Sequence, residues 1–309
     1  MEVAAVPCPL SPVVPHSPFP IPHSPPFDGP HPPAYLVALA RAHSKHRSPM
    51  HIIRAPRVTL IARQQFIPPP HIRWESDSDV AGEALAEFAG RLCYLSFGED
   101  AGLEGGHKSI PGRTSNHAYL NNILQVKHGS VLEHAVWSVL VEGVSRSLTH
   151  ELIRHRAGMG YSQLSQRYVD ESDIAFVLPP EIEEGTPEFD VWRQACESSL
   201  NSYRELLSDL TDRVGDDGPA TMRKKRARQA ARSVLPNAAE TKIVITGNAR
   251  AWRHFCEMRG SGSADLEIRR LAGCVLRVLH DEAANIFEDM RLVPSPDGVD
   301  LIVTQHSKV

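Results

Sequence analysis

Proline is concentrated at one end of this sequence and limits where a folded domain can begin. Roughly half of the chain's 25 prolines lie within residues 1–35, some in pairs such as Pro25-Pro26 and Pro32-Pro33. Proline fixes φ and lacks a backbone N–H, so this density excludes regular helices and sheet ladders. We therefore expect residues 1–50 to be a disordered extension and residues 51–309 to fold as one domain. Deletion up to Met50 should leave folding and activity intact, unless the extension binds a partner.

The sequence after this extension predicts a mixture of helices and strands. Short β-rich runs predict strands at 58–62, 136–142 and 243–247. Apolar residues at helical spacing predict helices at about 79–97, 115–126, 145–153, 187–214, 219–232, 248–258 and 264–287. We expect Gly143 to end the second strand, Asp77 or Ser78 to cap the first helix, and Asn248 to cap a later one. Helices dominate without a regular βαβ rhythm, so the predicted class is α+β.

The charge and the cysteines exclude several classes of protein. The net charge is -4 and the sequence pI is about 6.5, so the chain as a whole has no attraction to nucleic acid or anionic membranes. The five cysteines are scattered, which argues against a disulfide framework or a zinc site and favours a reducing compartment. No apolar run has the length of a membrane span, and no signal peptide begins the chain. We expect a soluble, cytoplasmic protein without a bound metal.

The stretch Arg154–Tyr168 concentrates side chains that suit an anionic, planar ligand. It contains three arginines, a histidine, two serines, two glutamines and two tyrosines around a glycine-bearing turn. Guanidinium groups bind phosphate bidentately, and amides can read the edges of bases. The competing interpretation is a helix end, where cations suit the negative end of the helix dipole. The serines and glutamines between the arginines favour a binding site.

Four polar clusters, this stretch included, lie at the edges of predicted elements, where binding sites are usually built. The others are His128 with Glu133-His134, the run 232–236, and Asn248-Ala249-Arg250 with Arg259 and Glu267-Ile268-Arg269. Over about 58–287, the four in this order resemble the flavin-dependent thymidylate synthases. The family's signature is Arg-His-Arg, a spacer, Ser, one residue, Arg and Tyr. It is filled here by Arg154-His155-Arg156, Ser165, Arg167 and Tyr168.

This resemblance implies an enzyme that methylates C5 of a uridine nucleotide, most simply dUMP to dTMP. Methylenetetrahydrofolate would supply the carbon, FAD would carry the hydride and NADPH would reduce the flavin, while the protein supplies orientation and electrostatics. The resemblance also implies a homotetramer with a small, mostly antiparallel sheet and sites drawn from several subunits. No cysteine lies in a cationic helix-start setting that would activate it as a nucleophile, which is consistent with flavin chemistry.

Matching the family's pattern residue by residue implies two sets of contacts. The nucleotide would contact Glu151, Arg154, Gln163, Ser165, Arg167, Arg232 and Arg259. Among these, Arg259 would be catalytic, because a cation beside the pyrimidine stabilises charge that develops on a carbonyl. The flavin and folate would contact His128, Glu133, His155, Arg156, Ser162, Asn248, Arg250 and His254. We expect the rest of the basic run 223–232 to be a solvated helix face, and Glu267 and Arg269 to pair within their own helix.

The motif departs from the family's pattern at two points. Eight residues separate Arg156 from Ser165, where the family has seven, and Gly158 and Gly160 could absorb the extra residue as a bulge. Gln163 stands where the family usually has glutamate.

Other exchanges also lie near the expected ligands. Glu151 stands where the family often has glutamine, and Ser263 and Asp265 replace histidine and glutamine at the flavin rim. Exchanging a carboxylate and an amide near the ribose changes which hydroxyls can be bonded. UMP, the substrate of relatives in nucleoside-antibiotic pathways, is therefore an alternative to dUMP. From another class, a nucleic-acid-binding protein could use 154–167 and 223–232 on a phosphate backbone, although the acidic net charge argues against it.

Overall fold

The described part of the chain belongs to one compact unit. The computed structural model describes residues 50–103, 113–213 and 219–309, all of them within the unit Ser48–Val309. Apart from Met50, the predicted extension at 1–50 lies outside the described residues. No helix among the described residues has both the length and the apolar character needed to cross a bilayer.

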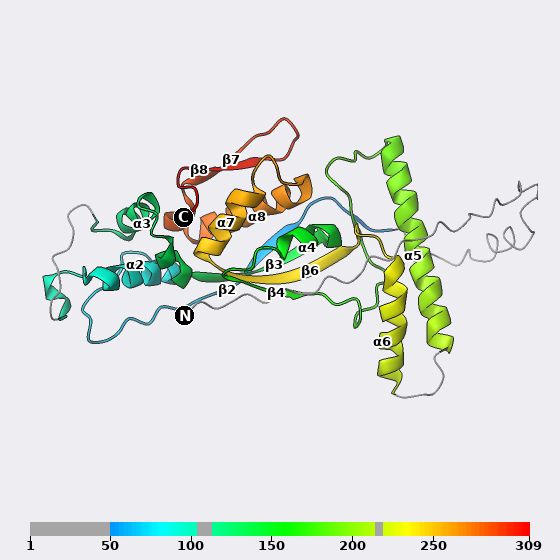
Figure 1. The fold of residues 1–309 in the computed structure, drawn as a ribbon, viewed down its shortest axis with the longest axis horizontal. Coiled ribbons are helices and arrows are strands. Elements are labelled where there is room, and N and C mark those ends of the chain that lie inside the picture. The colour runs from blue at the N-terminus through cyan, green and yellow to red at the C-terminus, as the bar shows by residue number, and fades with distance from the viewer. Residues whose placement is uncertain (1–49, 104–112, 214–218) are drawn as a thin grey trace, which may run out of the picture. The chain divides into compact units, whose positions relative to one another are not determined.

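A four-stranded antiparallel sheet forms the centre of this unit (Figure 1). Its order is β2 (Arg57–Arg63), β3 (Val136–Ser145), β6 (Glu240–Asn248) and β4 (Met159–Gln163), so β2 and β4 are the edge strands. Two small pairs accompany it: parallel β1 (Ile52–Ile53) with β5 (Phe176–Val177), and antiparallel β7 (Met290–Val293) with β8 (Leu301–Thr304). The predicted α+β class is confirmed.

One face of the sheet is packed and the other is half-open. Helices α4 (Arg146–Leu152), α7 (Ala249–Arg259) and α8 (Leu266–Glu282) lie on the same side of the sheet in Figure 1. Burial alternates along β3 and β6, as the period of a strand requires, and the buried residues include Trp137, Val139, Ile243 and Ile245. This packed face builds the main core, which continues to α2 (Ala81–Tyr94), α3 (Asn116–Gln125), η2 (Gly129–His134) and α9 (Ala284–Phe287).

The long helix α5 (Pro187–Arg213) packs on a core of its own. It runs beside α6 (Ala220–Ala231), which continues into η3 (Arg232–Val234) (Figure 1). Cys196 and Leu200 of α5 join Ile174, Phe176 and Ala239 in a second buried cluster. The cluster fixes the segment after β4 and the segment before β6 relative to α5, which is how the sheet edge that carries the motif is anchored.

Four sequence predictions need correction. Gly143 does not end its strand: it lies inside β3 at φ 71°, where the register with β6 shifts between Val141 and Val144. No side chain caps α2 through Asp77 or Ser78, because the cap position is Val80, whose N–H donates to the Ser78 hydroxyl at 3.2 Å.

The other two corrections concern the C-terminal third. The predicted helix 264–287 is divided at Ala283 into α8 and α9. Glu267 and Arg269 do not pair within their helix, because Glu267 accepts hydrogen bonds from the backbone and hydroxyl of Ser145 and Arg269 pairs with Asp297.

Candidate active site

Two turns meet where the Arg-His-Arg motif lies. The first follows α4 and leads into β4, and the second joins β6 to α7. Within the first turn, the Tyr161 hydroxyl donates to the carbonyl oxygens of His155 at 2.6 Å and Leu152 at 3.1 Å. The N–H of Asn248 donates to the Gly158 carbonyl at 3.0 Å, which ties the two turns together. The motif is therefore held by a tyrosine hydroxyl within its own turn and by a backbone hydrogen bond to the second turn.

Arg259, at the end of α7, reaches back to the first turn. Its Nε donates to Nε2 of His155 at 2.9 Å, and its terminal nitrogens donate to the Glu151 carboxylate at 2.8 Å and the Glu151 carbonyl at 3.4 Å. A nitrogen that accepts a hydrogen bond carries no proton, so His155 is neutral with its proton on Nδ1. Burial first, then the charges of Arg259 and His254, lower the pKa of His155 to about 4. The imidazole therefore stays uncharged near neutral pH.

Glu151 has a second acidic neighbour. Burial raises the pKa of its carboxyl group, a hydrogen bond and repulsion from Asp265 raise it further, and Arg259 and Arg154 oppose the shift. Asp265 occupies the N-cap position of α8 but makes no side-chain capping bond. Its carboxyl group instead lies beside Glu151, so repulsion from this neighbour favours the protonated form of the Glu151 carboxyl group.

Two adjoining cavities contain most of the predicted cofactor residues. The larger has a volume of about 440 Å³, and its polar lining is Arg154, His155, Arg156, His254 and Arg259. The smaller, of about 200 Å³, is lined by Glu133, Gly158, Asn248, Arg250 and His254. They share His254, Ala157 and Ala251. Sequence positions more than a hundred residues apart thus converge on one cationic surface.

An ion pair and a capping residue form part of the wall of the smaller cavity. Arg250 and Glu133 pair at 2.6 Å, with 46% and 47% of their side chains exposed. Asn248 caps α7 as predicted, since its side-chain oxygen accepts from the N–H of Ala251 at 2.9 Å. Its other side-chain atoms face Gly158, where a Cβ would lie 2.6 Å from Nδ2. The exposed ion pair is the part of this wall that an anionic ligand could displace.

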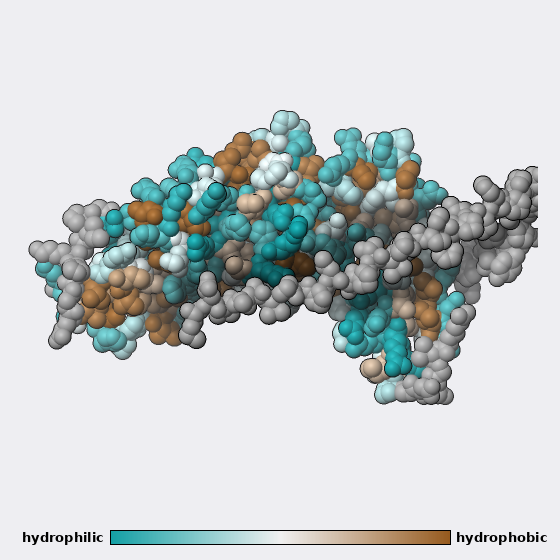
Figure 2. Space-filling model, in the orientation of Figure 1, coloured by the Kyte–Doolittle hydropathy of each residue, from teal (hydrophilic) through white to brown (hydrophobic). Residues whose placement is uncertain are grey.

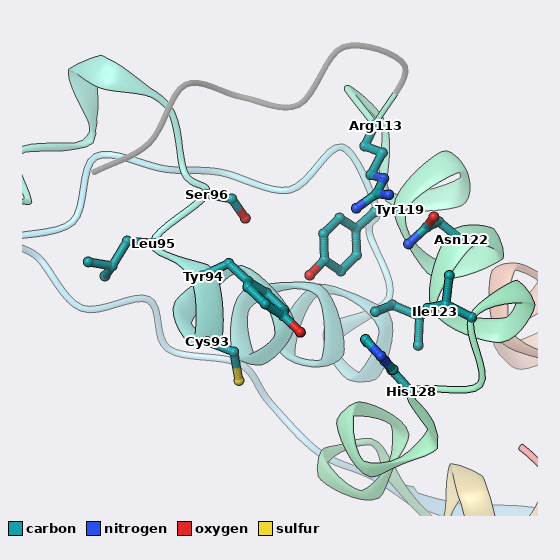
Figure 3. A pocket seen from close by; sticks show the side chains of 10 residues that line it. Cys93, Tyr94, Leu95, Ser96, Arg113, Tyr119, Asn122, Ile123 and His128 are labelled. Atoms are coloured by element: carbon teal, nitrogen blue, oxygen red, sulfur yellow. The ribbon is translucent and has the colours of Figure 1, made fainter. Parts of the chain in front are cut away.

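His128 lies in a third cavity, of about 610 Å³ (Figure 3). In Figure 3, His128 and Tyr94 lie on one side of the space and Arg113 lies on the other, with Tyr119 between the two sides. Burial raises the pKa of Tyr119 to about 12, so its hydroxyl stays protonated. The guanidinium of Arg91 lies 4.7 Å from the centre of the Tyr119 ring, an arrangement that fixes the ring by cation–π attraction. An aromatic, partly apolar cavity of this kind suits a flat ring system.

The remaining predicted contacts lie along and beyond β4. The Gln163 amide donates to Thr149 at 3.3 Å and Thr241 at 3.2 Å. The Ser165 hydroxyl accepts from the N–H of Arg167 at 3.4 Å, and Arg232 begins η3. None of these residues, nor Ser162 on the exposed side of β4, is among those that line the two adjoining cavities. One chain therefore brings six of the eight predicted cofactor contacts together with Arg154 and Arg259, but not Ser162, His128 or the whole nucleotide set.

Comparison with known proteins decides the family. The model of the family described as thymidylate synthase complementing protein matches residues 77–283, about two-thirds of the chain. The chain belongs to this family. It is 50% identical over 245 residues to the flavin-dependent thymidylate synthase of Mycolicibacterium vanbaalenii, covering 79% of this chain and 94% of the relative.

Two further relatives carry the same name. The protein from Mycobacterium sp. (strain JLS) is 50% identical over 252 residues, 80% of this chain and 95% of the relative. That from Mycobacteroides abscessus is 49% identical over 248 residues, with the same coverage. The predicted resemblance is confirmed.

Several residues that shape this site were not predicted from the sequence. Tyr161 holds the turn through two carbonyls, and the Phe255 ring lies 5.4 Å from the His155 ring. Asp265 was singled out only as an exchange at the flavin rim. Its residue type, common at N-caps, could have placed it at a helix start, but nothing local to Asp265 points to Glu151 on a different helix.

Proposed function

We propose that this protein is a flavin-dependent thymidylate synthase that converts dUMP to dTMP with methylenetetrahydrofolate, FAD and NADPH. One observation carries the proposal: Arg259 is fixed by His155 and Glu151 at the wall of a cationic cavity. The names of relatives about 50% identical over nearly their whole length support the same activity. A soluble, cytoplasmic location and the absence of a structural metal belong to this proposal.

The residues around the two cavities fit a flavin nucleotide. His155, Arg156, Asn248, Arg250 and His254 supply hydrogen-bond donors and positive charge of the kind that a pyrophosphate and a polar ring edge require. Gly158 leaves no room for a Cβ beside Asn248, so the Asn248 side chain lies directly against the backbone of the motif at the cavity wall. When bound, FAD supplies the hydride chemistry. Glu133 and Ser162 are proposed as further flavin contacts, and His128 and its aromatic cavity as the folate side.

The nucleotide would be held by positive charge at both of its ends. Arg167 and Arg232, with Ser165, would bind the phosphate by charge-assisted hydrogen bonds. Glu151, Arg154 and Gln163 would contact the sugar and base. Arg259 would lie beside a pyrimidine carbonyl, where a guanidinium already fixed by two partners stabilises developing negative charge without reorganising.

A homotetramer would unite the two halves of this site. Ser162 lies on the half-open face of the sheet with Leu140 and Val244, which are only partly covered. Figure 2 shows a second group of hydrophobic residues over the α2 region, where Ile67 is 77% and Leu92 47% exposed. Contiguous apolar surface of this kind marks protein interfaces. Subunit contacts on these surfaces would bring Arg167 and Arg232 of one chain to the cavities of another.

The deciding experiment is a visible spectrum followed by an NADPH oxidation assay. We expect flavin absorbance after incubation with FAD, and NADPH oxidation that yields dTMP only when dUMP and methylenetetrahydrofolate are present. A large preference for UMP over dUMP would replace the substrate and retain the chemistry. Protein that never takes up flavin and instead shifts DNA with a steep salt dependence would contradict the proposal and favour the nucleic-acid alternative.

A further inference from the structure

A buried carboxyl group lies close to the segment that carries Ser165 and Arg167. Glu171 is only 4% exposed, and its N–H donates to the Tyr203 hydroxyl at 3.1 Å. Among the described residues, its Oε1 atom is buried without a hydrogen-bond partner. Leaving such an atom unpaired is costly, so a buried carboxylate is retained where a neighbouring charge or a ligand compensates it.

The neighbouring charge is Arg146, the first residue of α4. One of its terminal nitrogens donates to the Leu164 carbonyl at 2.8 Å, while its Nε is buried and unpaired among the described residues. Burial and the nearby positive charge of Arg232 both lower the pKa of Arg146, and Glu171 opposes them. Arg146 is thus a half-buried cation that is influenced by both the charge of Arg232, proposed to bind phosphate, and the acid Glu171.

The carbonyl that Arg146 contacts belongs to the residue next to the Ser165–Arg167 turn. Leu164 directly precedes Ser165, whose hydroxyl accepts from the N–H of Arg167. The Nε of Arg167 is itself buried without a partner among the described residues. The hydrogen bond from Arg146 to the Leu164 carbonyl therefore lies directly before the Ser165–Arg167 turn.

We propose that Glu171 and Arg146 are positioning residues for the phosphate group of the nucleotide. Glu171 compensates the charge of Arg146, which would otherwise be repelled by Arg232. Arg146 holds the Leu164 carbonyl, and the turn thereby presents Ser165 and Arg167 to the phosphate beside Arg232. This inference rests on the proposed function, since it takes the phosphate monoester of dUMP as the ligand.

The test compares dUMP binding and turnover in FAD-loaded protein. Burial raises the pKa of Glu171 to about 7, although Arg146 opposes the shift, so the measurements are made at pH 8, where the carboxyl group is mostly ionised. Glu171→Gln keeps the shape and removes this charge, so we expect the Kd for dUMP to rise by roughly tenfold, the lower range for losing a charged partner. At saturating dUMP, kcat should be unchanged, because neither residue touches the reacting atoms. Glu171→Asp, which keeps the charge, should recover most of the affinity. Arg146→Gln should weaken binding as well, and adding Glu171→Gln to it should cost little more.

Arg204→Gln is the matched control. Arg204 also clamps this segment, through the Ser172 carbonyl at 2.7 Å, but it does not touch Leu164. An unchanged or tighter Kd in Glu171→Gln, or an equal loss in Arg204→Gln, would overturn the inference. If Glu171→Gln fails to fold, Arg146→Gln decides: it removes the charge that holds the Leu164 carbonyl, and wild-type affinity there would also overturn the inference. Wild-type protein that neither binds nor converts dUMP would instead remove the proposed function.

Discussion

The Nε atom of Arg259 donates a hydrogen bond of 2.9 Å to Nε2 of His155. The two residues come from α7 and from the turn after α4, and they are proposed to serve different ligands, the pyrimidine and the flavin. Their direct contact fixes the histidine tautomer and the plane of the guanidinium together. The two residues proposed to contact the pyrimidine and the flavin are therefore coupled directly within one chain.

Replacing Arg259 with alanine should reduce catalysis more than binding. The side chain is held by His155 and Glu151 rather than by the ligand, so its removal takes away fixed positive charge where negative charge develops. We expect kcat to fall by about 10²–10³, the usual effect of removing one such donor, with a smaller change in the Kd for dUMP. Steady-state kinetics and dUMP titration measure the two. A kcat close to that of the wild type would remove the catalytic assignment.

Protonation of His155 should destabilise the folded protein at low pH. The pKa of His155 is about 4 in the fold and 6.5 in the unfolded chain, so the unfolded state binds more protons between these values. The free energy of unfolding should therefore fall as the pH drops from about 6.5 towards 4. Denaturant unfolding over this range, compared with His155→Gln, isolates the contribution. The variant retains an acceptor for Arg259 and cannot titrate, so an identical slope in both proteins would contradict the predicted shift.

The parts of this fold that could be predicted from sequence are those with a local signal. Asn248 caps α7 through its own side chain, and the apolar spacing of α5 gives its length almost to the residue. Gly143 was misjudged because a glycine at positive φ can sit at a bulge inside a strand as readily as at its end.

The hairpin of β7 and β8 had no such local signal. It is tied to α7 by the buried pair of Arg253 and Asp289 at 2.6 Å, a contact between distant parts of the sequence. The candidate site also depends on contacts between distant parts of the sequence. The family motif indicated which residues matter, but the contact of Glu151 with Asp265 and the separation of Arg167 from the cavities depend on tertiary packing.

Within the basic run 223–232, only Arg232 is expected to contact the nucleotide. Arg232→Ala should weaken dUMP binding by about 1.5–3 kcal/mol, the loss of one charged hydrogen bond. Arg226→Ala is the control, because Arg226 lies on the exposed side of α6 in the same run. Calorimetric titration with dUMP measures both. Equal losses in the two variants would indicate a general effect of positive charge instead of a phosphate contact.

Deletion of residues 1–49 should leave stability and turnover unchanged. Met50 packs against the cluster of Phe176 and Leu200, so a chain that starts there keeps this contact. A longer deletion, to Ala55, also removes β1 and its pairing with Phe176 and Val177, and it should lower the melting temperature. Thermal unfolding and turnover of both truncated proteins test the boundary. Loss of activity already in the shorter deletion would assign a role to the extension.

Two glycines in the spacer of the motif should differ sharply in their tolerance of alanine. Gly158 has φ 70°, and a Cβ there would lie 2.6 Å from Nδ2 of Asn248, whereas a Cβ at Gly160 would meet only the Thr246 carbonyl at 3.9 Å. Gly158→Ala should therefore cost about 1–2 kcal/mol in backbone strain alone and displace Asn248 from the cavity wall. We expect weaker FAD binding and a lower flavin content on purification.

Gly160→Ala supplies the control within the same spacer. Because Gly160 pairs with Thr246 in the regular ladder of β4 and β6, alanine there should leave both stability and FAD affinity close to those of the wild type. Fluorescence titration with FAD and thermal unfolding compare the two variants. If they lose FAD equally, the spacer as a whole tolerates no change and the specific role of Gly158 fails. If neither loses it, Asn248 does not hold the flavin, because the substitution at Gly158 must move its side chain.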